Sequence, residues 1–252
     1  MRQNAAMDST QVEAIERATV QAVSPEAVAE IPGWIVPFDA GTVGRAKSAA
    51  PLNHMAPERS VLREIEAAYA QHGLPLMLRI PVVAAFDGFR TLLVERGYRE
   101  EIPTEVQTAV ASDVRAVSGG DPAELLAAPS QDWASVFLGE GFDPVDGASR
   151  VKQLGQAAGS LFAIVRERGR PVAAGAAAFS HGWASVHGMR TAQASRGRGL
   201  AARVLATLAG AAIGRGYQRV FLQVSGANAP AQTLYRRAGF ARAWTYSYWR
   251  AI

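Results

Sequence analysis

Residues 193–201, with the sequence QASRGRGLA, have the composition of an anion-binding turn that leads into a helix. Glycine adopts backbone conformations that other residues avoid, and a helix start presents unpaired N–H groups with a partial positive charge. Arg196 and Arg198 add charge-assisted hydrogen-bond donors, so the turn favours a pyrophosphate ligand. The alternative is a surface turn that carries arginines and caps a helix.

Two common nucleotide-binding patterns do not fit this turn. No Lys-Ser or Lys-Thr pair follows the second glycine, as a phosphate loop of the NTPase type requires. A third glycine is missing, and the preceding strands are predicted to form an antiparallel meander rather than a βαβ unit. Both the nucleotide-hydrolase and the nicotinamide-binding hypotheses are therefore weakened.

A second motif lies at residues 228–240, with the sequence NAPAQTLYRRAGF. Asn228 and Pro230 are typical of a helix start, and Gly239 fits the position just after a helix end. These structural roles do not account for Tyr235, although a packing tyrosine is the simplest explanation for that residue.

Together the two motifs resemble the GNAT superfamily of acyl-CoA-dependent N-acyltransferases. The pyrophosphate turn of that family, Arg/Gln-x-x-Gly-x-Gly/Ala, is matched by Arg196, Gly199 and Ala201. Its later element, Asn-x-x-Ala-x-x-Leu-Tyr-x-x-x-Gly-Phe, is matched by Asn228, Ala231, Leu234, Tyr235, Gly239 and Phe240. The resemblance covers roughly residues 107–252, a common length for one domain.

The resemblance implies an acetyl-CoA-dependent N-acetyltransferase in which a primary amine of a small molecule or protein attacks the thioester directly, with no metal. The implied pyrophosphate-binding residues are Arg196, Gly197, Arg198, Gly199, Leu200 and Ala201. The strand at Met189, Arg190 and Thr191 would hold the pantetheine arm, Asn228 would contact the cofactor, and Tyr235 would be the general acid. A phenol with a pKa near 10 can give a proton to a departing thiolate, whose pKa is near 8.5.

The sequence offers several candidates for the residue that removes the proton from the amine. Glu140 and Asp143 lie on a glycine-rich loop, where a carboxylate is more often solvated than catalytic. His187, on the strand that leads to the cofactor arm, has a suitable unperturbed pKa and could act directly or through water. A hydrogen-bonded packing role is the alternative for this histidine.

Hydrophobic spacing and Gly and Pro residues predict the elements that position these motifs. Helices are expected at 10–23, 58–72, 87–96, 121–126, 132–137, 148–158, 200–213 and 229–238. Strands are expected at 34–38, 75–86, 160–166, 171–179, 183–191, 219–224 and 243–252. Pro81 indicates a sheet edge or a strand end, and residues 139–147 are expected to form a polar loop.

The two halves of the chain contain an internal repeat, in which residues 91–98, TLLVERGY, align with residues 233–240, TLYRRAGF. In the same alignment Leu93 stands opposite Tyr235 and Phe86 opposite Asn228, and the first half has no counterpart of the arginine-glycine turn. We therefore expect an α/β fold with mixed sheets, made of two tandem GNAT-like domains, each a mostly antiparallel sheet flanked by helices. The predicted domains are a degenerate copy at 1–106 and a catalytic domain at 107–252.

Charge and composition narrow the function further. Residues 1–125 have a net charge of −6 and residues 126–252 a net charge of +10, which suggests an anionic partner for the second half. The chain has no cysteine, so a cysteinyl intermediate is excluded. It shows neither a signal peptide nor a membrane span, and we expect a cytoplasmic monomer or homodimer.

Two other functions remain open from the sequence. One is a sensor that binds acyl-CoA without turnover, for which Tyr235 would not be needed. The other is a nucleic-acid binder that uses the basic half. The basic residues are not interleaved with aromatic residues in a stripe, and the arginine cluster is compact, so a local phosphate ligand is favoured over nucleic acid.

Overall fold

A computed structural model describes residues 7–101 and 103–251. Its α-helices are α1 (Ser9–Val23), α2 (Val61–Gln71), α3 (Asp87–Glu95), α4 (Ala111–Arg115), α5 (Gln131–Ser135), α6 (Pro144–Gln156), α7 (Leu200–Gly214) and α8 (Ala229–Arg237). Short 3-10 turns are η1 (Gly44–Ala46), η2 (Ala84–Phe86) and η3 (Gln193–Ser195).

Twelve strands of the described residues form two sheets. The smaller sheet contains β1 (Ala27–Ile31), β2 (Trp34–Phe38) and β3 (Ala50–Pro51). The larger sheet contains β4 (Met77–Pro81), β5 (Tyr98–Glu100), β6 (Thr104–Val110), β7 (Glu124–Leu126), β8 (Leu161–Glu167), β9 (Arg170–Ser180), β10 (Trp183–Thr191), β11 (Arg219–Ser225) and β12 (Ala241–Ala251). Its order is β4-β12-β6-β11-β10-β9-β8-β7, and β5 also pairs with β12.

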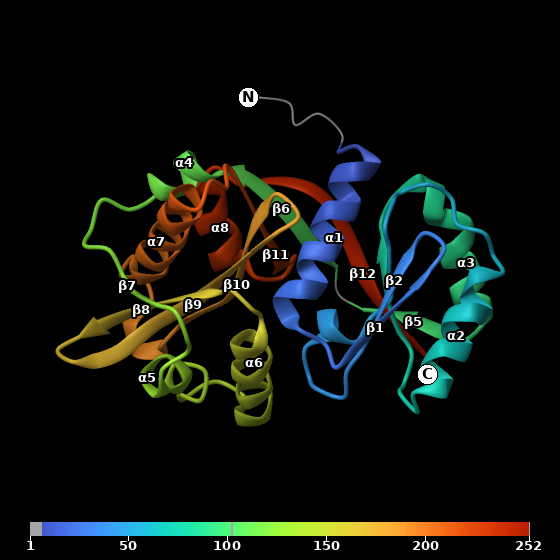
Figure 1. Cartoon of the computed structure of the whole chain (residues 1–252), viewed down its shortest axis with the longest axis horizontal. Helices are drawn as coiled ribbons and strands as arrows, with labels where there is room; N and C mark the ends of the chain where they lie inside the picture. Colours follow the sequence, from blue (N-terminus) through green and yellow to red (C-terminus); the bar gives the residue numbers. More distant parts are fainter. Residues whose placement is uncertain (1–6, 102, 252) are drawn as a thin grey trace.

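Helices cover both faces of the part of the large sheet that runs from β6 to β10 (Figure 1). On one face α4, α7 and α8 pack on Val186 and Leu222. On the other face α1 packs on Trp183, Phe221 and Trp244, because Val12, Ile15 and Ala18 repeat at helical spacing. Helices α5 and α6 cover the neighbouring strands β8 and β9 on that same face.

The two halves of the chain share structural elements. Helix α1 comes from the first half but packs on the sheet of the second, and it lies between the two halves in Figure 1. Strand β12 comes from the second half, and its last residues pair with β4 and β5 of the first. Glu16 of α1 and Arg79 of β4 form an ion pair at 2.8 Å that is almost completely buried. The predicted boundary between residues 106 and 107 lies inside β6, in the middle of this continuous sheet.

Most predicted elements are present close to their expected ends. Pro81 is the last residue of β4, as expected for a strand end; β4 is the end strand in the sheet order, and Ala49 pairs with its outer side. The helix predicted at 121–126 is wrong, because residues 124–126 form the edge strand β7 and pair with β8. The strand predicted at 75–86 covers only β4, and the polar loop ends earlier than expected because Asp143 caps α6.

The alignment of the internal repeat also holds for whole elements. It places Asp87–Glu95 of α3 on Ala229–Arg237 of α8. In the same way β4 corresponds to β11, and α2 corresponds to the later part of α7. Both halves therefore contain a helix, a strand, a helix and a strand in the same order, ending with β5 in the first half and β12 in the second.

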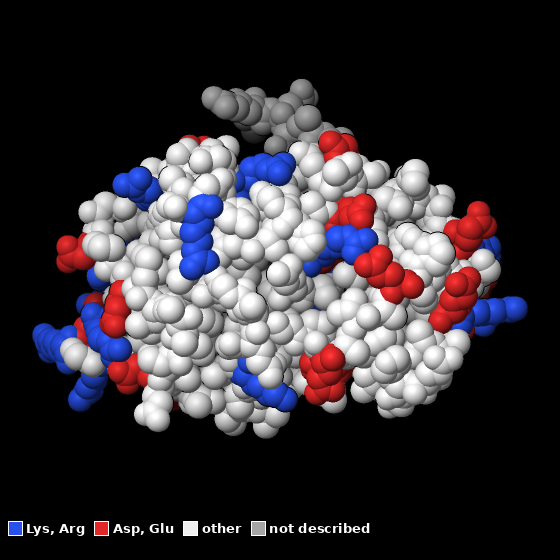
Figure 2. All heavy atoms as spheres, viewed as in Figure 1, with Lys and Arg blue, Asp and Glu red and all other residues white. Residues whose placement is uncertain are grey.

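Charge is unevenly distributed over the surface shown in Figure 2. Acidic side chains gather over the first half, and basic side chains gather at the end formed by β8 and β9, where Arg168 and Arg170 are exposed. None of the helices in the described part of the chain is long and apolar enough to cross a membrane.

Candidate functional site

Strands β10 and β11 separate partway along their length. Their parallel pairing covers only Ala184 to Val186 on β10, opposite Val220 to Leu222 on β11. Beyond that point, among the described residues, β10 pairs only with β9, through a bulge between His187 and Arg190. Gly188 lies in this bulge with a φ of 60°, and a Cβ there would come within 2.7 Å of Leu154. The edge of β10 that faces β11 is thus left without a strand partner over its last residues.

The arginine-glycine turn follows this free edge and leads into α7. Gly197 and Gly199 have φ values of 75° and 76°, in the left-handed region that favours glycine. Within the described residues, the amides from Gly197 to Ala201 make no hydrogen bond. Five unpartnered N–H groups at the start of a fifteen-residue helix form a site that attracts anions.

The two arginine side chains of the turn differ in their contacts. Arg198 forms an ion pair with Glu167 at 2.7 Å, whereas Arg196 donates a long hydrogen bond to the Thr191 carbonyl. Arg196 also lies over the ring of Phe142, at 5.7 Å from its centroid. Arg196 is therefore the more available of the two for an anionic ligand.

The loop between α5 and α6 packs against the same region. Arg190 of β10 stacks on Phe142 at 4.1 Å and forms an ion pair with Asp146 at 3.1 Å. A Cβ at Gly141 would come within 2.7 Å of the Gln193 side chain, so this loop lies directly against η3. Glu140 is exposed on the loop, and no contact among the described residues joins it to His187 or Tyr235.

Helix α8 presents Tyr235 to the separated strands. Asn228 caps the helix by accepting a hydrogen bond from the Ala231 amide at 3.2 Å, and Gly239, with a φ of 86°, follows its end. Tyr235 is 7% exposed, packs on Phe240, and its hydroxyl has no hydrogen-bond partner in the described residues. Burial raises the pKa of Tyr235 to about 12, so the hydroxyl keeps its proton at neutral pH.

His187 lies on the opposite side of the sheet, on the face covered by α1. It is 3% exposed, packs edge-on against Phe221, and neither ring nitrogen has a partner among the described residues. Burial, together with the positive charge of Arg45, holds the pKa of His187 well below its usual value of 6.5. The imidazole is therefore neutral at neutral pH, and it is a weaker base than the sequence suggested.

Arg45 is a residue near the site that the sequence did not indicate. It lies on η1 of the first half, next to Gly44, where a Cβ would come within 3.0 Å of the Tyr248 ring on β12. It is half-buried and has no ion pair or hydrogen bond within the described residues. Burial lowers the pKa of Arg45, and its charge affects the pKa values of His187 and Tyr235. Only the fold could reveal this neighbourhood, since Arg45 and His187 lie in different halves of the sequence.

The structure thus groups the predicted cofactor-binding residues along one path. This path runs from Met189, Arg190 and Thr191 on the free edge of β10 to residues 196–201. Beyond β11, Asn228 caps α8 and Tyr235 lies on that helix. Met189 itself is partly buried, and a Cβ on Gly175 would come within 2.6 Å of its sulfur atom.

A sheet whose parallel strand pair separates beside a glycine turn at a helix start places the protein in the GNAT fold, and solved structures agree. A GCN5-related N-acetyltransferase from Kribbella flavida is 18% identical, with a TM-score of 0.72 over 98% of this chain and 96% of that one. A GCN5-related N-acetyltransferase from Sphaerobacter thermophilus is 16% identical, with a TM-score of 0.56 over 97% and 93% of the two chains. A tandem GNAT protein from the clavulanic acid biosynthesis pathway is 13% identical, with a TM-score of 0.58 over 97% and 96%.

The chain belongs to the family described as probable histone acetyltransferase Rv0428c C-terminal, whose model matches residues 9–249. This match spans both halves, from the start of α1 to the last residues of β12. No curated protein sequence matches the chain significantly.

Proposed function

We propose that the protein is an acetyl-CoA-dependent N-acetyltransferase that acts on a primary amine. The observation that carries this proposal is an edge of β10 that is free within the described part of the chain and is followed by a turn with five amides that have no partner there. An extended pantetheine arm can pair with the free backbone edge while the pyrophosphate occupies the turn. The GNAT fold of the chain and its family membership support the same activity.

Each part of the path would bind a different part of the cofactor. The amides from Gly197 to Ala201 would bind the pyrophosphate, with Arg196 adding a charge-assisted hydrogen bond. Arg198 would contribute only when it leaves Glu167. The backbone of Met189 and Thr191 would hold the pantetheine arm, and one amide of this edge would polarise the thioester carbonyl.

The reaction would proceed in a ternary complex. The amine nitrogen attacks the carbonyl carbon, the carbon–sulfur bond breaks, and Tyr235 gives a proton to the departing thiolate. Within the described residues the Tyr235 hydroxyl is unpartnered, and burial keeps it protonated, so it can donate a hydrogen bond to the sulfur as the bond breaks; its raised pKa of about 12 makes it a weaker acid than a free phenol. The amine loses its proton to His187, to Glu140 or to water, and the low pKa of His187 favours a hydrogen-bond acceptor that orients the amine.

Arg45 would help to prepare the amine. A positive charge in a partly buried site disfavours a second positive charge nearby, so it lowers the pKa of an approaching ammonium group. A larger share of the acceptor would then be the neutral amine, which is the nucleophile. This effect reduces the need for a strong general base at the site.

The acceptor would be a small molecule or a protein amine. The family description names histone acetylation, which would place a lysine side chain of a protein among the candidate acceptors. The matching order of elements in the two halves supports a tandem arrangement with catalysis in the second half, as does the likeness to a tandem GNAT protein. We also propose that the protein is cytoplasmic and that it is a monomer or a homodimer.

The proposal is tested by titrating acetyl-CoA into the full chain and then screening an amine panel for release of free CoA thiol. We expect binding of acetyl-CoA and thiol release with at least one amine. Binding without release under any amine would instead favour an acyl-CoA sensor, and absence of binding would refute both.

A further inference from the structure

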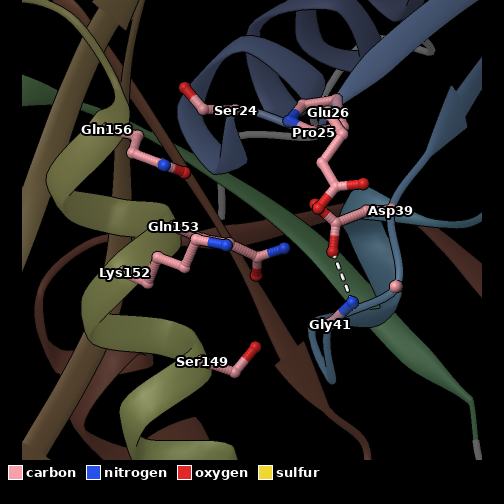
Figure 3. Close-up of a pocket in the computed structure, with 10 residues that line it drawn as sticks. Ser24, Pro25, Glu26, Asp39, Gly41, Ser149, Lys152, Gln153 and Gln156 are labelled. Carbon is pink, nitrogen blue, oxygen red and sulfur yellow. Dashed lines mark hydrogen bonds between the residues drawn. The ribbon is translucent and has the colours of Figure 1, made fainter.

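A polar cavity of about 550 Å³ lies between the two halves, away from the arginine-glycine turn. Figure 3 shows the end of α1 and the segment after β2 on one side and α6 on the other. The residues that line it are Ser24, Pro25, Glu26, Asp39, Ala40, Gly41, Ser149, Lys152, Gln153 and Gln156. None of these residues has a role in the proposed acetyl transfer.

Two carboxylates share one wall of this cavity. Figure 3 shows the side chains of Glu26 and Asp39 approaching each other at the cavity. Asp39 is only 7% exposed, and its Oδ1 accepts a hydrogen bond of 2.6 Å from the Gly41 amide. No cationic side chain of the described residues lies within 4.0 Å of either carboxylate. A buried carboxylate without a cation is costly, and a second carboxylate beside it raises that cost.

The opposite wall contributes an unpartnered amide. Gln153 of α6 is 3% exposed, and neither its Oε1 nor its Nε2 has a hydrogen-bond partner in the described residues. Its side chain points from α6 toward the two carboxylates in Figure 3. Buried polar groups are nearly always hydrogen-bonded, so an unpartnered amide in a cavity wall indicates a missing partner.

We propose that this cavity binds the primary ammonium group of a small organic cation. An ammonium group has three N–H donors, which match the carboxylate oxygens of Asp39 and Glu26. The Gln153 Nε2 atom lies toward the carboxylates in Figure 3, and its unpartnered Oε1 atom is a further acceptor in the same wall. A hard divalent metal ion fits less well, because it prefers six or more oxygen ligands. Within the described residues, moreover, no group of three His, Cys, Asp or Glu side chains could hold a metal.

A substitution at Lys152 can distinguish a cationic ligand from an anionic one. It lines the cavity from α6 and is exposed. Its ammonium group repels a bound cation but would anchor a bound anion. Removing its charge therefore strengthens or leaves unchanged the binding of a cation, and weakens the binding of an anion.

The test is calorimetric titration of 1,4-diaminobutane into the full chain, with 1,4-butanediol as the neutral ligand of the same length. We expect the diamine to bind and the diol not to bind. Asp39→Asn keeps the oxygen that accepts from Gly41 but removes the charge, and should weaken diamine binding about tenfold or more. Glu26→Gln should weaken it by about two- to fivefold, because Glu26 is exposed. The matched control Asp121→Asn, at an exposed aspartate elsewhere, should leave binding unchanged.

The proposal is overturned if the diamine does not bind, if the diol binds equally well, or if Asp39→Asn and Asp121→Asn behave alike. A loss of diamine affinity in Lys152→Gln would also overturn it. If Asp39→Asn fails to fold, the variants at Glu26 and Lys152 still decide, since both side chains are exposed. Because only binding is measured, the outcome does not depend on whether the protein transfers acetyl groups.

Discussion

Replacing Gly199 with aspartate tests the turn most directly. Gly199 precedes α7 with a φ of 76°, and a Cβ at this position would have no neighbour within 4 Å. The new side chain therefore fits against the protein but enters the space where the pyrophosphate is proposed to bind. A carboxylate about 4 Å from one phosphate charge costs about 1 kcal/mol in water and about 4 kcal/mol at an effective dielectric constant of 20. Because the turn is exposed, we expect a loss near the lower end of this range.

A loss of about 1.4 kcal/mol corresponds to a tenfold rise in Kd, so Gly199→Asp should weaken acetyl-CoA binding about tenfold or more in a calorimetric titration. The left-handed backbone adds about 1–2 kcal/mol of strain for any residue other than glycine. The matched control is therefore Gly216→Asp, which lies beyond the other end of α7 with a φ of 84° and equally open space. Both variants should lose stability through this strain, and Gly216→Asp should lose more, because the helix dipole favours a carboxylate at a helix start and disfavours one at a helix end, but only Gly199→Asp should lose affinity. Unchanged binding in Gly199→Asp, or an equal loss in both variants, would refute a pyrophosphate site in this turn.

Three further substitutions test other parts of the site and the fold. Tyr235→Phe should lower thiol release strongly while leaving acetyl-CoA affinity nearly unchanged, because only the proton donor is lost; a loss of affinity alone would assign Tyr235 to packing. The free energy of unfolding, measured by urea denaturation, should fall less between pH 7 and pH 5 in His187→Asn than in the wild type. The unfolded chain binds a proton below about pH 6.5 that the buried imidazole of His187 does not bind, so the wild type loses stability as the pH falls and the variant should lose less. Glu16→Gln should lower the free energy of unfolding by about 3–5 kcal/mol, because it leaves the buried charge of Arg79, at 1% exposure, without an opposite charge; a loss below about 1 kcal/mol would contradict this.

Local sequence signals predicted the elements well where the signal and the final packing agree. The α8 helix has a capping Asn228, an early Pro230 and a terminal Gly239, and its ends are nearly as predicted. The segment 121–126 begins with Asp-Pro, as helices often do, but its leucines pair with β8 at the sheet edge. A three-residue edge strand is determined by its neighbour, which no local pattern reveals.

The joining of the two halves could not be predicted for the same reason. Both the alternation of elements and the internal repeat indicated two separate units. In the structure β12 is long enough to pair with β6 at one end and with β4 at the other. The length of a strand can be read from a sequence, but its two different partners cannot. The same limit applies to Arg45 and to Asp39, whose neighbours come from distant parts of the chain.

The contacts between the halves bear on how the second half could work. Thr42 of the first half has no part in the predicted chemistry, yet its amide donates to the Ser149 hydroxyl at 3.0 Å and its own hydroxyl donates to Asp146 at 3.0 Å. Asp146 in turn forms the ion pair with Arg190 on the free edge of β10. The first-half segment that carries Asp39 and Arg45 is thus tied through two hydrogen bonds and one ion pair to the strand proposed to hold the cofactor arm. A half that lacks a phosphate-binding turn of its own can therefore still position the site, because its loop fixes the carboxylate that orients Arg190.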